Sequence, residues 1–272
     1  MKKMLITGSN GFIGKNLIEF YKNKFSIIEH TKQNNVLDIL KKNPDIIINC
    51  AASIYDENSM FESNVLLVKE ILNYVKKTNC KMIQIGSSSE YGRKTKPTKE
   101  SDSLSPSTLY ETTKSAATML CVGYAKTYNL DIVVARPYSV YGKYEKSYRL
   151  FPRLYNAFFQ KEAMTLYNGV HDFIYIKDFI KGLDILLNSS KDKTCGDIVN
   201  FGSGKQYTNF EILDVFKKIL NMDAPVEINT KMNKNFESDI WICDNTYAKE
   251  KYNFLCEYNI ESGIIDYIKT MK

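Results

Sequence analysis

Histidine is scarce in this chain of 272 residues, which contains only His30 and His171. So few imidazoles argue against a histidine-rich metal site and leave few candidates for a serine–histidine triad. The six cysteines stand far apart without a Cys-x-x-Cys pair, so neither a zinc ribbon nor a disulfide framework is expected. Proton chemistry here is therefore expected to use tyrosine, lysine, serine or a carboxylate, without a metal.

Long hydrophobic runs are also missing, since no apolar segment approaches the roughly 18 to 20 residues that span a bilayer. The first residues, MKKMLITGSNG, lead into a glycine-rich turn and not into a secretory signal. The net charge is a modest +6, and its basic residues are scattered, the densest group being RKTKPTK at 93–99. We expect a cytoplasmic protein that suits anionic small molecules, with neither nucleic acid nor membrane as a partner.

What the first half of the chain does have is strand-like and helix-like segments in alternation. Nearly continuous, β-branched apolar runs lie at 3–7, 26–29, 45–52, 81–86 and 131–137. Helical patterns such as 60–77 and 109–128 stand between them. Strands that are apolar on both faces are typical of parallel sheets covered by helices. The pattern predicts an α/β fold with a doubly wound parallel sheet of the Rossmann type.

The order loosens beyond Pro137, where the sequence becomes aromatic and irregular before one more strand and turn in GDIVNFGSG. We expect residues 1–141, with 171–204 returning to them, to form a dinucleotide-binding domain. Residues 142–170 and 205–272 are then expected to form a smaller, substrate-binding lobe.

Three glycines, Gly8, Gly11 and Gly14, follow the first expected strand in TGSNGFIG. Small residues let the backbone approach a pyrophosphate, and the start of a helix offers free N–H groups and a partial positive charge. Because this turn joins a strand to a helix, it predicts a dinucleotide site.

The end of the second strand, SIIEHTKQN, should touch the adenosine ribose, and the contact falls on Thr31 or Lys32. A basic residue there suits the 2′-phosphate of NADP, whereas a carboxylate would bind the 2′-hydroxyl of NAD. We expect NADP (NADPH) to be favoured over NAD, although one residue of register would give the position to Glu29.

The stretch SPSTLYETTKSAAT, 105–118, places Tyr110 and Lys114 four apart, on one face of an expected helix. One interpretation is a surface aromatic beside a surface cation. The other is a catalytic phenol whose pKa is lowered by the ammonium. Because Tyr247 and Lys251 repeat the spacing, the surroundings must decide.

Those surroundings include GSSSEYG, 86–92, at the end of the fourth expected strand, where a doubly wound sheet builds its crevice. With TGSNGFIG, DIIINCAAS, ESNV, YETTK, ARPYSVYG, HDFIYIKD and VNFGSG, the chain resembles the extended short-chain dehydrogenase/reductases of the NAD-dependent epimerase/dehydratase family, over nearly its whole length. The resemblance implies that Tyr110 is the acid/base, that Ser87 binds the reacting oxygen, and that Lys114 binds the nicotinamide ribose and favours the phenolate. Tyr247 and Lys251 lie outside the pattern.

The resemblance also implies binding residues. Asp38 and Ile39 would contact the adenine, Ala51 and Ala52 would line the pyrophosphate and ribose, and Pro137 would begin the segment beside the carboxamide. The full cofactor set is Gly8, Asn10, Gly11, Phe12, Ile13, Gly14, Thr31, Lys32, Asp38, Ile39, Ala51, Ala52, Tyr110, Lys114 and Pro137. The substrate set is Ser87, Ser88, Ser89, Ser139, Arg149 and Arg153, although Ser88 also suits a plain polar strand end.

Departures from the family pattern narrow the reaction. The 4,6-dehydratases carry an Asp–Glu pair where this chain has Ser88 and Ser89, so dehydration is not expected. The epimerase-reductases that complete GDP-fucose use a cysteine and a histidine where this chain has Ser89 and Tyr175. The Ser/Tyr/Lys set that is left suffices for hydride transfer to or from a carbonyl.

We therefore expect an NADPH-dependent reductase of a nucleotide-linked 4-keto sugar, with the hydride going to C4 and the proton coming from Tyr110. A nucleotide-sugar 4-epimerase with tightly bound NAD is the alternative, because it runs the same step in both directions. A non-catalytic dinucleotide sensor is less favoured, because Ser87, Tyr110 and Lys114 are all present.

Two further expectations concern partners. The family's diphosphate-binding arginines are replaced by His171 and missing from NFESDIWICD. Either Arg149, Arg153, Lys205 or Lys231 would take their role, or the substrate is held differently. Helices 57–77 and 108–128 carry apolar residues on more than one side, which predicts a homodimer through these two helices.

Overall fold

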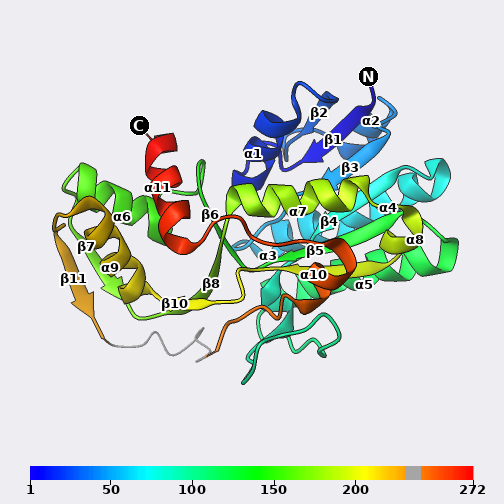
Figure 1. Cartoon of the computed structure of the whole chain (residues 1–272). Coiled ribbons are helices and arrows are strands. Elements are labelled where there is room, and N and C mark those ends of the chain that lie inside the picture. The colour runs from blue at the N-terminus through cyan, green and yellow to red at the C-terminus, as the bar shows by residue number, and fades with distance from the viewer. Residues whose placement is uncertain (231–239, 272) are drawn as a thin grey trace.

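Six parallel strands form the centre of the protein in the computed structural model, which describes residues 1–230 and 240–271 (Figure 1). The strand order is β2-β1-β3-β4-β5-β9, with every neighbouring pair parallel. In that order the strands are Ser26–His30, Lys3–Thr7, Ile46–Asn49, Lys81–Ile85, Ile132–Pro137 and Asp197–Phe201. The predicted doubly wound parallel sheet is confirmed.

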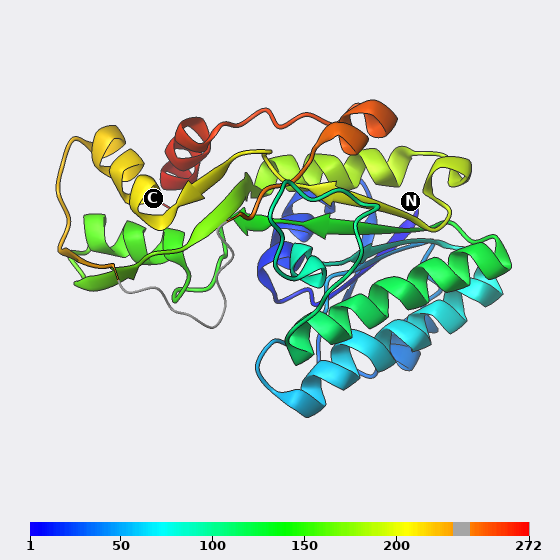
Figure 2. The same cartoon turned by 90° about the horizontal axis from the view of Figure 1, so that it is seen from below.

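Alternation along each strand divides the core into two layers. On β1, Met4 and Ile6 pack in one buried cluster with α1 (Phe12–Tyr21) and α7 (Ile176–Asn188). Leu5 points the other way, into a second cluster that the sheet shares with three helices. Those helices are α2 (Val36–Leu40), α4 (Leu67–Thr78) and α5 (Leu109–Tyr128), and Figure 2 shows α4 and α5 side by side on this face.

The segment 57–77, expected as one helix, is divided into α3 (Glu57–Phe61), a π-helical turn η1 (Glu62–Leu66) and most of α4. Asn64 in this turn is only 2% exposed. Its side chain pairs with the backbone N–H and carbonyl of Ser53, at 3.0 Å each, and donates to Thr113 Oγ1 at 3.0 Å. The π turn therefore ties the loop after β3 to α5, and such turns are frequent at functional sites.

A second lobe is built from later parts of the chain and lies beside the carboxyl end of the sheet (Figure 1). Its aromatic core includes Tyr141 stacked on Phe151 at 4.0 Å between ring centres. It contains α6 (Leu150–Phe159), β7 (Met164–Tyr167), α9 (Asn209–Leu220), β11 (Val226–Asn229) and α11 (Ile260–Met271). The division into residues 1–141 with 171–204 and residues 142–170 with 205–272 stays a proposal.

A three-stranded sheet, β10-β8-β6, connects the two parts. Its strands are Gln206–Thr208, Val170–Tyr175 and Ser139–Tyr141. Of the short helices nearby, α8 (Lys191–Thr194) contacts β5 and α10 (Thr246–Tyr252) contacts β9. Buried Asp172 on β8 accepts hydrogen bonds from the backbone N–H groups of Ser203, Gly204 and Cys243, at 2.6, 3.0 and 3.0 Å. Asp172 therefore holds Cys243, and the turn at Ser203 and Gly204, against β8.

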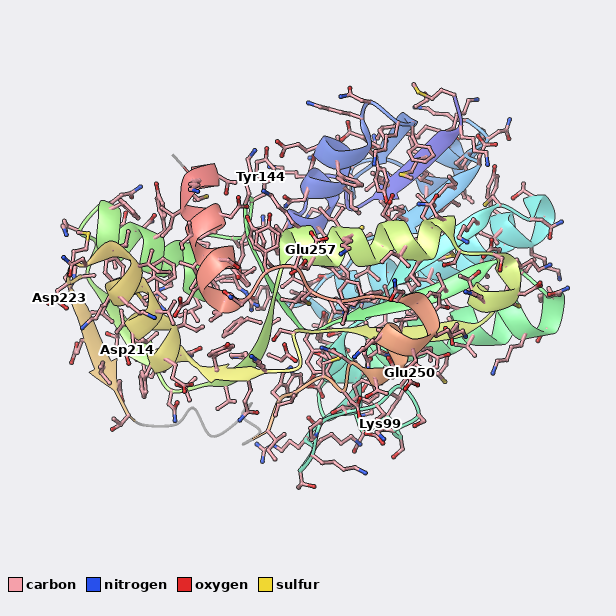
Figure 3. All side chains as sticks on the ribbon, viewed as in Figure 1. Lys99, Tyr144, Asp214, Asp223, Glu250 and Glu257 are labelled. Atoms are coloured by element: carbon pink, nitrogen blue, oxygen red, sulfur yellow. The ribbon has the colours of Figure 1, made fainter. Side chains whose placement is uncertain are left out.

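The segment after β6 makes a further contact with the first helix. Asn16 on α1 donates to the Lys143 carbonyl at 2.7 Å, and Lys143 pairs with Glu19 at 3.0 Å. Figure 3 shows the neighbouring Tyr144 at this junction. Within the described residues, no helix combines the length and the apolar character needed to cross a membrane.

Candidate active site

The carboxyl ends of β1, β3 and β4 are joined by buried polar side chains. Thr7 on β1 donates to Asn49 on β3, and Asn49 donates to Gln84 Oε1 on β4 at 2.7 Å. Gln84 in turn donates to the carbonyl of Ile85 at 3.0 Å. Because each donor has an acceptor, the chain of bonds can hold the strand ends in register without an unpaired polar atom.

The glycine-rich turn after β1 leaves no room for side chains. Gly8 has a φ of +63°, and a Cβ there would lie 2.8 Å from the backbone nitrogen of Ala51. A Cβ on Gly14 would lie 2.3 Å from the carbonyl oxygen of Gly8. Gly11 caps α1, and no side chain caps the first N–H groups of this helix. The result is a bare backbone cradle at a helix start, the kind of site that holds a pyrophosphate.

Ser87 and Tyr110 meet at the end of β4. The strand ends at Ile85, and Ser87 then caps a short 3-10 helix, η2 (Ser88–Tyr91). Tyr110 stands in the first turn of α5, whose start is fixed by a capping box between Thr108 and Glu111. The Ser87 side chain lies close enough to Tyr110 to lower the pKa of the phenol.

Lys114, one turn further along α5, is only 3% exposed and donates from Nζ to the Ile85 carbonyl at 2.6 Å. Its ammonium therefore lies at the same strand end as Ser87. The structure thus brings all three predicted catalytic residues together.

The pKa of Tyr110 is raised above its ordinary value, chiefly because the phenol is buried, and the nearby Glu90 carboxylate adds to the rise. Ser87 and Arg149 act in the opposite direction. Burial lowers the pKa of Lys114. The expected lowering of the phenol pKa is therefore not seen in the chain alone, because burial dominates and Lys114 donates to a backbone carbonyl.

The predicted cofactor residues divide into two groups. Asn10, Phe12 and Ile13 belong to the glycine cradle and the start of α1, and Ala51 packs against Gly8. Ala52 follows in the exposed loop, and Pro137 ends β5.

The other group surrounds the end of β2. Thr31 donates to the side chain of Asn34 at 3.1 Å within a turn, and Lys32 is exposed. Asp38 pairs with Lys41 at 2.7 Å, while Ile39 is buried in the second core layer. These side chains therefore already have protein partners, and their cofactor roles stay proposals.

Among the predicted substrate residues, Ser89 lies with Ser87, 2.7 Å between hydroxyls, and Ser88 is buried. Ser139 bonds His171 Nδ1 at 3.2 Å. Burial, and then the charge of Arg149, lower the pKa of His171 to about 4, so its imidazole is neutral near pH 7. The position at which the family resemblance implies an arginine is therefore uncharged here.

Arg149 is the predicted cation that faces this neighbourhood, because its charge acts on Tyr55, Tyr110 and His171. Arg153 differs: it donates to the carbonyl of Thr165 at 3.1 Å and is directed at β7. Lys205 is exposed in the turn after β9, and Lys231 lies outside the described residues.

Two carboxylates near the site were missed. Glu90 forms a fully buried ion pair with Arg136, and Glu145 is buried beneath Arg149 with 3.4 Å between Oε1 and Nε. Arg136 could have been noticed, because a charged residue inside the apolar strand IVVARP needs a buried partner. Nothing in the sequence marks Glu145, since its burial depends on how the loop before α6 folds.

Comparison with known proteins decides the family. The model of the NAD dependent epimerase/dehydratase family matches residues 4–202. The chain belongs to this family. One relative is the dTDP-D-glucose 4,6-dehydratase of Dictyostelium discoideum, 26% identical over 82% of this chain and 62% of that protein. The chain spans about three fifths of the length of the first curated relatives that it matches.

Solved structures show the family's fold at lower identity. The dTDP-glucose 4,6-dehydratase of Bacillus anthracis, in complex with NAD, has a TM-score of 0.87 at 21% identity, covering 99% of this chain and 96% of that one. The UDP-glucuronic acid 4-epimerase of Bacillus cereus, in complex with UDP-glucuronic acid and NAD, has a TM-score of 0.86 at 22% identity, covering 99% and 100%.

The prediction that NADP is favoured over NAD is wrong, because these structures of the family contain NAD. The end of β2 offers a physical reason. Lys32 is exposed to solvent and its charge acts on Asp56, whose pKa is lowered first by Ser59 and further by this lysine. Thr31, the other residue at this position, is engaged by Asn34 and so is not free to bind a 2′-phosphate.

Proposed function

We propose that this protein is an NAD-dependent oxidoreductase that acts at C4 of a nucleotide-linked sugar. The observation that carries the proposal is the convergence of Ser87, Tyr110 and Lys114 on the end of β4. The cradle of Gly8 and Gly14 fits a dinucleotide, since no side chain fills it. Bound NADH would supply the hydride for a 4-keto sugar, and NAD would accept one from C4.

In the reductive direction, Tyr110 would donate its phenolic proton to the C4 oxygen, and Ser87 would hold that oxygen by its hydroxyl. Lys114 would leave the Ile85 carbonyl to hold the cofactor's ribose, since that carbonyl keeps a donor in Gln84. Arg149 is the cation best placed for the substrate's diphosphate.

The side chains that other reactions would need are engaged elsewhere. Ser88 and Ser89 carry no carboxylate, and both oxygens of Glu90 are occupied by Ser87 and Arg136. Tyr175 donates to Asp266 at 2.7 Å inside the second lobe. Neither dehydration nor carbon-acid epimerisation is therefore proposed.

Reduction of a 4-keto-6-deoxy sugar is our first candidate, and a 4-epimerase that keeps NAD bound is the second. The second is favoured by the family's solved structures, which contain NAD and, in the epimerase, a UDP-sugar. Both share every residue named above.

The test is to incubate the protein with a panel of nucleotide 4-keto-6-deoxy sugars and NADH, following absorbance at 340 nm, and with UDP-sugars and no added cofactor, following C4 epimers by NMR. Net consumption of NADH supports the reductase, and epimers formed without net consumption support the epimerase. If neither panel reacts, although NAD binds, the proposed function is wrong.

The homodimer is also a proposal. Phe61 on α3, Leu66 on η1 and Met119 on α5 are apolar side chains exposed between 46% and 54% on the helices predicted to meet a second copy. Light scattering at micromolar concentration tests it, because a mass near the 31.4 kDa of one chain would exclude the dimer. Cytoplasmic location and the lack of a nucleic-acid partner likewise stay predictions.

A further inference from the structure

Glu90 and Arg136 form an ion pair inside the protein, 0% and 1% exposed. Glu90 Oε2 accepts from Arg136 Nε at 3.0 Å and lies 2.9 Å from Nη2. Arg136 Nη1 donates to the hydroxyl of Tyr91 at 2.8 Å, and Tyr91 donates to Asn200 at 2.9 Å. These contacts hold the side chains of Glu90 and Arg136 in one position.

The other oxygen of Glu90 fixes the serine of the candidate site. Oε1 accepts from the backbone N–H of Ser87 at 2.7 Å and so closes the capping box of η2. A Cβ on Gly86 would lie 2.8 Å from the same oxygen, so the turn needs a glycine for the carboxylate to approach. The Ser87 side chain, whose proximity lowers the pKa of Tyr110, is positioned through this contact.

Glu90 also faces the proposed acid/base pair. Its charge raises the pKa of Tyr110 and that of Lys114, opposing the effect of burial on the lysine. The titratable and charged groups around Glu90 come from three elements. They are Arg136 on β5, Tyr91 on η2, and Tyr110, Lys114 and Cys121 on α5.

Stability alone is a weak reason for such a pair. Removing two charges from water costs about what their attraction returns, and a well-packed apolar pair is often as stable or more so. A carboxylate in this place does, however, supply two things that an apolar side chain would not: an acceptor for the Ser87 N–H and a negative charge beside Tyr110 and Lys114.

We propose that Glu90, clamped by Arg136, is a positioning residue that fixes Ser87 beside Tyr110 and supplies the negative charge faced by the Tyr110–Lys114 pair. This rests on the proposed function for its effect on turnover, although the placement of the charge can be measured without a substrate. Glu90 itself moves no proton, because both its oxygens are occupied by Ser87 and Arg136.

The variants separate geometry from charge. Glu90→Gln keeps an oxygen for the Ser87 N–H and loses the charge, whereas Glu90→Ala loses both. Glu90→Gln/Arg136→Met removes both charges together, which guards against a fold weakened by an unpaired arginine. Glu100→Gln is the matched control: this half-buried carboxylate accepts from Asn200 N–H at 2.8 Å, at the far end of the same network, away from Ser87.

With the holoenzyme and a substrate found active above, Glu90→Gln should shift the alkaline fall of kcat to lower pH by about one unit, because Tyr110 loses its proton more easily. The double variant should shift it in the same direction by less. Glu90→Ala should lower kcat about tenfold or more with KM nearly unchanged, since Ser87 loses its cap. Glu100→Gln should do neither.

The substrate-free readout is the pH dependence of the Tyr110 signal in NAD-bound protein labelled with [13Cζ]tyrosine, identified by its loss in Tyr110→Phe. Glu90→Gln should titrate about one unit lower than the wild type, and Glu100→Gln should match the wild type. If no sugar reacts, the proposed function falls while this titration still tests the placement. An unchanged Tyr110 titration in Glu90→Gln, or an equal shift in Glu100→Gln, would overturn the proposal.

Discussion

Two tyrosine–lysine pairs with the same spacing occupy very different surroundings in this protein. In α10, Lys251 Nζ donates to the Tyr247 hydroxyl at 2.9 Å, and Tyr247 donates to Asp197 at 2.7 Å. In α5, Lys114 donates to a backbone carbonyl, while Tyr110 has Ser87 as a neighbour that lowers the pKa of its phenol. The pair with direct contact is thus the one outside the candidate site.

The two pairs differ in the groups that surround them. Asp197 on β9 also lies 3.0 Å from Lys251 and accepts from Tyr252 at 2.6 Å, so its charge is matched within the cluster. These bonds hold α10 against β9, and the Tyr247 hydroxyl and the Lys251 ammonium both have protein partners. Lys114 and Tyr110 face the strand ends beside the glycine cradle instead. Spacing puts two side chains on one face, and the neighbours decide what they do.

Exchange of each phenol for a phenyl ring should separate the two pairs most strongly. Tyr110→Phe should lower kcat by about 10² to 10⁴, the usual contribution of general acid–base catalysis, with NAD affinity kept because Lys114 is untouched. Tyr247→Phe should leave kcat within about twofold, since that hydroxyl bonds only within the α10 cluster. Steady-state kinetics and calorimetry with NAD make the comparison. Near-normal turnover in Tyr110→Phe would mean that the proton comes from elsewhere.

The two lysines should differ next, in cofactor binding. Lys114→Ala should raise the dissociation constant for NAD roughly ten- to a hundredfold, as expected for loss of a charged hydrogen-bond donor, and should also lower kcat. Lys251→Ala should leave NAD binding unchanged, because the Lys251 ammonium pairs with Asp197 and donates to Tyr247. Titration calorimetry of both variants decides. Equal weakening in the two would show that the effect is one of stability and not of contact.

The sequence predicted the parts of this site that depend on local pattern. The sheet follows from continuous apolar strands, and the cradle follows from glycines between a strand and a helix, where a Cβ would meet backbone within 3 Å. Ser87, Tyr110 and Lys114 could be brought together because a strand end and a helix start have fixed places in this fold.

The rest depends on long-range geometry that spacing does not encode. The Glu90–Arg136 pair joins residues 46 apart in sequence. The cofactor prediction failed for a related reason: residue type at the end of β2 does not show that Thr31 bonds Asn34 or that Lys32 is exposed. The predicted helix 57–77 was also interrupted, because Asn64 bonds Ser53 and Thr113 from a π turn.

The smallest expected effect is on stability, whose dependence on pH has opposite signs for Lys114 and Lys251. Burial lowers the pKa of Lys114 below 10.5, whereas Tyr247 and Asp197, outweighing burial, raise that of Lys251 above it. The native state therefore binds the Lys114 proton less tightly than the unfolded chain, and stability rises as the pH approaches 10.5. For Lys251 the sign is reversed, so its stabilisation is complete below pH 10.5 and is lost above it.

Lys114→Met should accordingly raise the free energy of unfolding at pH 7 by about 1 kcal/mol, the size of a single stabilising change, at the expense of function. That gain should shrink as the pH is raised to 10, because Lys114 of the wild type then increasingly loses its proton and no longer buries a charge. Lys251→Met should lower the free energy by about 0.5 kcal/mol, as for a partly exposed ion pair, and by the same amount at both pH values. Urea denaturation at pH 7 and pH 10 measures all four differences. A Lys114→Met protein less stable than the wild type at pH 7 would show that its bond to Ile85 outweighs the cost of burying the ammonium.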